Sequence, residues 1–119
     1  MDVVNRGVIV IKPKAPFVDW VNSTDDTGVV ITLDEARQDC TAYLMPEVRD
    51  DDELQDFLAR NYPFLFEHEF IAWVKDEDVW PTNQDFRTFL EWFDVDFHSV
   101  VLDLAEGSPL ALEDETEIG

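Results

Sequence analysis

The apolar residues of this chain follow two different spacings, and the change between them constrains the fold more than any other feature. Gly7 to Lys12 is a β-branched run that ends at Pro13, as in a short buried strand. From Leu54 onward, apolar residues instead recur at every third or fourth position, as on one face of a helix. A chain that contains both spacings predicts an α+β domain, in which aromatic-rich helices pack on a small sheet.

We expect about three strands in this sheet. The last strand carries apolar residues on both faces, with His98, Val100 and Leu102 on one and Phe97 and Val101 on the other, which is typical of a central strand. Every connection between strands contains a helix, so parallel pairing is allowed and the strand order stays open. The strands are predicted near 7–12, 40–45 and 95–104.

Five helices follow from apolar stripes and end signals. Thr32 and Glu35 have the spacing of a capping box, and the acids after Asp50 suit a helix N-terminus. Pro63 should separate two helices, and Asn83 should cap the last one, whose stripe is the clearest in the chain. The helices are predicted near 16–22, 33–38, 51–61, 63–75 and 83–93.

The length of 119 residues suits one globular domain, which we place at 1–105. The segment 106–119 is rich in acids and is predicted to be a flexible tail. No apolar run has the length of a membrane helix, and the N-terminus lacks the pattern of a secretory signal. Cys40 is the one cysteine, so no disulfide can form within the chain. These features predict a cytoplasmic protein.

The net charge of −20 is the most unusual feature of the composition. It argues against direct binding to nucleic acid, whose phosphates attract Lys and Arg, and against binding to an anionic membrane. It favours a basic protein as partner. Two acidic runs stand out, and Asp76-Glu77-Asp78 is the better contact candidate because negative charge after a helix end opposes the helix dipole.

Tryptophans are the second class of interaction candidate, because Trp is enriched where proteins bind one another. Trp73 lies on a helical stripe and is expected in the core. Trp80 lies in a loop, and Trp92 lies on the flank of its helix stripe. Trp80 and Trp92 are therefore predicted at an interface, with the alternative that Trp80 covers a helix end.

Asp94, Asp96 and His98 form the best metal-like cluster, because alternate residues of a strand point to one side. The acidic segments do not match a calcium loop, and Glu67-His68-Glu69 lacks the spacing of a zinc helix, so we interpret that triplet as a solvated or partly packed helix segment. The alternative for Asp94, Asp96 and His98 is a hydrogen-bonded rim of the core.

No catalytic residue is assigned from the sequence. The serines lack the Gly-x-Ser-x-Gly turn of hydrolases, Cys40 lies in a predicted buried strand, and the four glycines are isolated, so no phosphate loop or cofactor is predicted. An acid/base pair among 28 carboxylates cannot be chosen on this basis.

The opening Arg6 to Pro13 and the segment from Trp80-Pro81 to Phe93 resemble small acidic bacterial proteins of uncharacterised function. This resemblance implies no activity and no site residues.

Three functional hypotheses remain. The leading one is a non-enzymatic acidic protein that binds a basic protein, including the case in which its carboxylates mimic the phosphates of nucleic acid. The second is a metal-dependent or acid/base enzyme with its site near the start of the last strand. The third is an acidic surface that serves solubility or high salt alone. A homo-oligomer is compatible with each.

Overall fold

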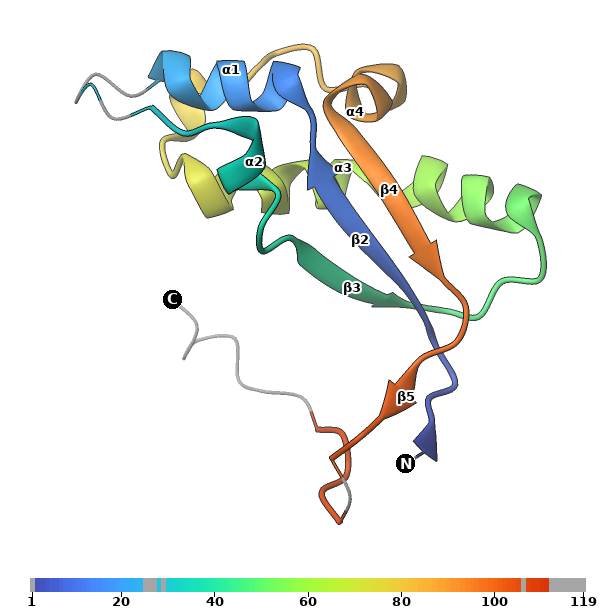
Figure 1. Cartoon of the computed structure of the whole chain (residues 1–119). Helices are drawn as coiled ribbons and strands as arrows, with labels where there is room; N and C mark the ends of the chain where they lie inside the picture. The colour runs from blue at the N-terminus through green and yellow to red at the C-terminus, as the bar shows by residue number, and fades with distance from the viewer. Residues whose placement is uncertain (1, 25–27, 29, 106, 112–119) are drawn as a thin grey trace.

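The computed structural model describes residues 2–24, 28, 30–105 and 107–111 of the chain. Three antiparallel strands in the order β3-β2-β4 form a sheet, and α3 crosses one face of it, while α1, α2 and α4 gather at the end where β2 finishes and β4 begins (Figure 1). The prediction of an α+β fold with a three-stranded sheet is confirmed. The bounds are β2 Gly7–Pro13, α1 Ala15–Thr24, α2 Leu33–Ala36, β3 Thr41–Met45, α3 Asp51–Trp73, a 3₁₀ turn η1 Glu77–Val79, α4 Phe86–Trp92 and β4 Phe93–His98.

A second pair of strands, β1 (Asp2–Val3) and β5 (Leu102–Asp103), forms a short antiparallel ribbon. The ribbon projects from the body at the end away from α1 and α4 (Figure 1). Two strands of two residues each have little stability of their own, so the ribbon depends on its attachment to β2 and β4.

β2 is the central strand, which corrects the expectation that the last strand would be. Residues of β2 alternate between buried and half-buried, and Val8 pairs with Leu44 of β3 on one side and His98 of β4 on the other. The predicted strand 95–104 ends at His98 and continues only as β5. Its apolar residues Val100 and Leu104 are exposed, so apolar character on both faces did not mean burial here.

α3 runs unbroken through Pro63, so the predicted division into two helices is wrong. A proline in a helix removes one backbone hydrogen bond and crowds the carbonyl four residues earlier, here that of Ala59. Leu58 on one side of Pro63 and Leu65 and Phe66 on the other are all buried in the same core. Burial of both halves outweighs the local cost of the proline.

Three helix starts have side-chain caps. Thr32 Oγ1 accepts a hydrogen bond from the Glu35 backbone N–H at 3.1 Å, which confirms the predicted cap. Asp50 Oδ1 accepts from the Glu53 backbone N–H at 2.9 Å at the start of α3. The cap of α4 is Asp85, whose Oδ1 accepts from the Thr88 backbone N–H at 2.7 Å, so the helix starts later than a cap at Asn83 would set it.

The core is built mainly from aromatic rings. Phe66 of α3 has its ring centroid 4.6 Å from that of Phe70, 5.5 Å from Phe89 and 5.7 Å from Phe93. Trp73, which the sequence analysis expects in this core, is instead 41% exposed and is the last residue of α3. The predicted tail lies outside the described residues, apart from 107–111.

Candidate functional site

The run Asp76-Glu77-Asp78 lies in the turn that follows α3, and all three side chains are exposed. Asp76 Oδ1 accepts a hydrogen bond from the Asp78 backbone N–H at 3.0 Å. Asp76 therefore caps η1, a local role that the sequence did not indicate. Glu77 and Asp78 remain on the surface, where a partner can reach them.

Trp80 and Trp92 are both half-buried. Trp80 Nε1 donates to the Val74 carbonyl at 2.8 Å, and its ring centroid lies 5.4 Å from that of Phe70, so Trp80 covers the C-terminal end of α3. The Trp92 ring centroid lies 6.0 Å from that of Trp20. Both rings pack in the aromatic core, and only their outer parts are available for an interface.

Asp94, Asp96 and His98 alternate along β4 as predicted, opposite the inward-facing Phe93. Asp94 Oδ2 lies 3.1 Å from Arg37 Nη1, and Asp96 Oδ2 lies 3.2 Å from Lys12 Nζ. The hydrogen bond from Lys12 is the main cause that lowers the pKa of Asp96. His98 Nε2 is 3.3 Å from Asp96 Oδ2.

The carboxylates of Asp94 and Asp96 are therefore each paired with a cation of the chain itself. Among the residues that the structure describes, no three His, Cys, Asp or Glu side chains are arranged to hold a metal ion.

The structure brings together a different polar cluster, which sequence reasoning missed. Glu69 of α3 is the one buried charged side chain in the described part of the chain, with 4% of its surface exposed. The Tyr43 hydroxyl, on the inner face of β3, donates to Glu69 Oε2 at 2.6 Å. The same hydroxyl lies 2.8 Å from His68 Nδ1, and His68 Nδ1 is 3.9 Å from Glu69 Oε2.

Burial changes the acidity of this cluster. Desolvation raises the pKa of Glu69 above its ordinary value, against the opposing effect of its hydrogen bond with Tyr43. Desolvation, followed by the hydrogen bond with Glu69, raises the pKa of Tyr43. The pKa of the Cys40 thiol is also raised, first by burial and then by the negative charge of Glu69. Cys40 is therefore held as a thiol, which is a poor nucleophile.

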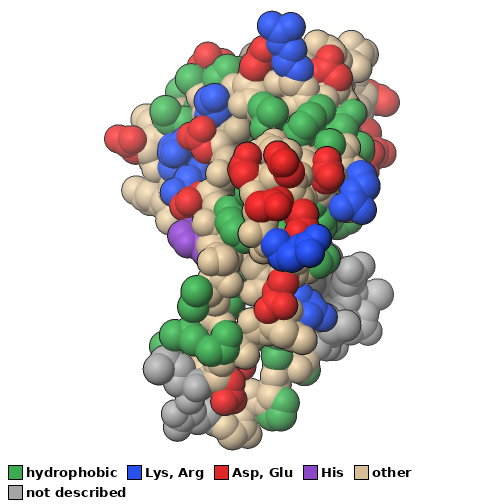
Figure 2. Space-filling view, turned by 90° about the vertical axis from the view of Figure 1, so that its right-hand side faces the viewer, with side chains coloured by type: hydrophobic (Ala, Val, Ile, Leu, Met, Phe, Trp, Pro, Cys, Tyr) green, Lys and Arg blue, Asp and Glu red, His purple; other side chains and the backbone are tan. Residues whose placement is uncertain are grey.

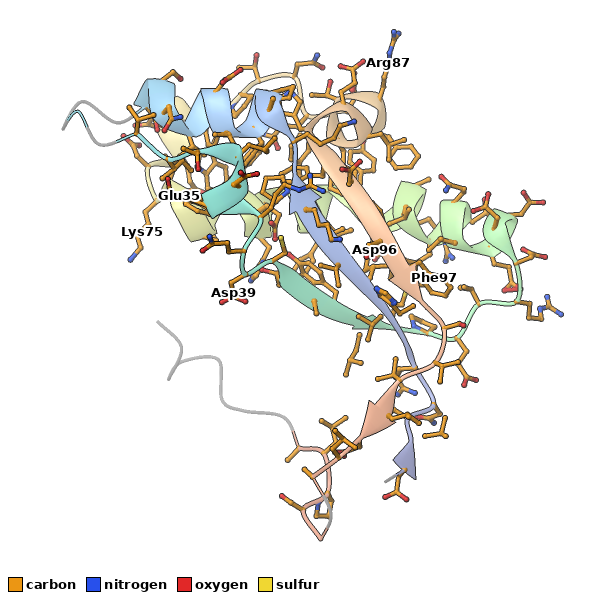
Figure 3. The ribbon with its side chains drawn as sticks, viewed as in Figure 1. Glu35, Asp39, Lys75, Arg87, Asp96 and Phe97 are labelled. Carbon is orange, nitrogen blue, oxygen red and sulfur yellow. The ribbon has the colours of Figure 1, made fainter. Side chains whose placement is uncertain are left out.

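A cavity of about 210 Å³ opens beside this cluster, between the start of β3 and the last turn of α3. Its charged lining residues are Asp39 and Glu69, both acidic, and Trp73 supplies an aromatic wall. Asp39 lies on the same side of the molecule as Glu35 and Lys75 (Figure 3). The full lining is Pro13, Ala36, Asp39, Cys40, Thr41, Glu69, Ala72 and Trp73.

The acidic and aromatic lining of the cavity is chemically compatible with a small cationic group. A buried carboxyl with a raised pKa can also hold or release a proton. One sequence signal pointed to Glu69, since it lies three and four residues after Phe66 and Leu65, within the apolar stripe of α3. A carboxyl at such a position must be buried or must disturb the stripe.

None of the helices in the described residues is both long and apolar enough to cross a membrane. Comparison of the chain with protein-family models, with curated proteins and with solved structures gave no significant match.

Proposed function

We propose that this protein is a non-enzymatic, acidic interaction protein that binds a basic protein partner in the cytoplasm. The observation that carries the proposal is a surplus of surface carboxylates that lack cations. Among the described residues, the ion pairs of Lys and Arg engage neither Asp50–Asp52 nor Asp76–Asp78. The carboxylates that they do engage are Glu53, Glu91, Asp94 and Asp96.

The surplus is spread over the surface and is not confined to the chain end. Figure 2 shows acidic side chains gathered on the face that holds the N-terminal part of α3, and Asp76–Asp78 follows the other end of the same helix. A field of one sign over the surface accelerates encounter with a partner of opposite charge and repels nucleic acid.

Apolar contact area supports the same proposal. The ribbon of β1 and β5 carries large apolar side chains that are exposed, Val3 at 74% and Leu102 at 46%. Val100 and Leu104 lie beside them at 72% and 75%. Neighbouring exposed apolar residues mark surfaces that bind other proteins. The outer parts of Trp80 and Trp92 offer a separate apolar surface, since Trp92 packs against Trp20 of α1, at the end of the molecule away from the ribbon.

The test is affinity capture from lysate of the source organism, followed by titration of the purified partner at about 0.1 M and about 0.5 M salt, a range over which exposed ion pairs are screened. We expect a basic protein whose affinity falls with salt. The variant Asp76→Asn, Glu77→Gln, Asp78→Asn should weaken it at low salt. The matched control Asp51→Asn, Asp52→Asn, Asp56→Asn makes the same change in net charge elsewhere on the surface.

Equal weakening by both variants would mean that overall charge, and not a contact at Asp76–Asp78, guides binding. An unchanged affinity in the first variant would contradict that contact. Failure to retain any basic protein at either salt concentration would contradict the proposed function.

A further inference from the structure

Glu69 is an unusual residue to bury in a chain with so few cations. A buried carboxylate is costly unless a cation pairs with it. Among the described residues, the ionic neighbour of Glu69 is His68 at 3.9 Å, and no Lys or Arg pairs with it. Arg37 and Lys12, whose charges act on the neighbouring Cys40, have other partners, because Arg37 binds Asp94 and the Pro13 carbonyl, and Lys12 binds Asp96.

The cavity beside Glu69 offers what a cationic group requires. Two acidic side chains and no Lys or Arg line it, Thr41 adds a hydroxyl, and Trp73 offers an aromatic surface on which an ammonium or guanidinium group can lie. The volume of about 210 Å³ suits a side-chain head group better than a drug-sized molecule, whose sites start at roughly 300 Å³.

We infer that this cavity, formed by Asp39, Thr41, Glu69 and Trp73, receives the cationic head of a lysine or arginine side chain of the partner. The inference rests on the proposed function and gives it an anchor point. Trp73 is three residues before Asp76, so the cavity and the Asp76–Asp78 run belong to one end of α3. Lys75 lies between Trp73 and Asp76 in the sequence and does not line the cavity.

The first test uses capped arginine, N-acetyl-arginine methylamide, titrated into ¹⁵N-labelled full-length protein. We expect saturable shifts of the Trp73 indole N–H and of the Cys40 and Thr41 amide signals. The matching capped citrulline has nearly the same shape but no charge, and it should cause no saturable shift. Shifts of equal size with both compounds, or no saturation with arginine, would overturn the inference.

Variants then test the residues. Glu69→Gln keeps an oxygen that can accept the Tyr43 hydroxyl hydrogen bond, and Trp73→Leu alters a partly exposed side chain, so both should fold. Each should weaken binding of capped arginine by about tenfold, the size of one charged or aromatic contact. The control Glu67→Gln removes an exposed carboxyl two residues before Glu69 and should leave binding unchanged. Equal affinity of Glu69→Gln and the parent protein would overturn the assignment.

The same variants separate this inference from the proposed function. If Glu69→Gln and Trp73→Leu bind the purified basic partner as tightly as the parent protein, the anchor is wrong while the acidic interaction function stands. If capped arginine binds but no basic protein is retained, the cavity binds free small cations. The claim that the cationic group belongs to a protein partner is then overturned. If both variants bind capped arginine and the basic partner more weakly than the parent protein does, the inference is supported.

Discussion

At the scale of single residues, Glu69 stands out because it is a charged side chain that is buried in the folded protein. Its side chain is 4% exposed and accepts a hydrogen bond from the Tyr43 hydroxyl at 2.6 Å. Because burial raises its pKa, the folded protein holds a proton on this carboxyl at pH values where the unfolded chain has released it. Glu69 therefore favours folding below its ordinary pKa of 4.5, and this contribution is lost as the pH rises through its raised folded value.

We predict that Glu69→Gln gains stability relative to the parent protein as pH rises from about 4 to about 7, since the variant has no carboxyl to ionise at this site. Urea unfolding at each pH measures the two free energies of unfolding. Glu67→Gln serves as the control, and a trend that both variants share is subtracted as an effect of overall charge. A difference between Glu69→Gln and the parent that does not change with pH would show that Glu69 does not titrate in this range.

At the scale of elements, α3 is the helix that organises the molecule. It carries five of the buried residues, caps its start with Asp50 and ends beside the cavity at Trp73. Pro63, which is exposed, lies in its middle. The acids Asp51, Asp52 and Glu53 suit the positive end of the helix dipole, so this acidic run has a structural role as well as a place on the acidic surface.

We predict that Pro63→Ala stabilises the protein by about 1–3 kcal/mol, because it restores a backbone N–H to the helix and removes the clash with the Ala59 carbonyl. Urea unfolding measures the change, and circular dichroism should show no loss of helix. Gln55→Ala, at another exposed position of α3, is the control and should change stability by only a few tenths of a kcal/mol. Destabilisation by Pro63→Ala would mean that both halves of α3 reach the core only through a bend at the proline.

At the scale of the whole molecule, the net charge of −20 opposes compaction by self-repulsion. Salt screens this repulsion, and the Debye length falls from about 10 Å at 0.1 M to about 3 Å at 1 M. Whole-molecule charge therefore links stability to salt even where no single ion pair matters.

We predict that the free energy of unfolding rises by on the order of 1 kcal/mol between about 0.05 M and 0.5 M KCl and then levels off. Thermal unfolding at a series of KCl concentrations measures the change. A control protein combines the six neutral substitutions at 51, 52, 56, 76, 77 and 78. Its free energy of unfolding should rise less with KCl than that of the parent protein. A steep rise that continues to molar KCl would instead support adaptation to high salt as the reason for the acidity.

Local signals in the sequence determined many of the elements. β-branched residues predicted β2, the Thr32 and Glu35 spacing predicted the start of α2, and the acids after Asp50 predicted the start of α3. These features depend on residues within one turn or one strand of each other, so they can be recognised without knowledge of the rest of the fold.

Tertiary structure decided what depends on distant residues. Pro63 remained inside a helix because Leu58 and Phe66 share one core, and β2 became central because Leu44 and His98 pair with Val8 from opposite sides. The cavity exists because β3 brings Tyr43 and Thr41 to the last turns of α3. Residues 26 positions apart meet there, and no local spacing encodes that contact. The acidic composition is a property of the sequence, but packing decided which carboxyl among the described residues is buried, that of Glu69.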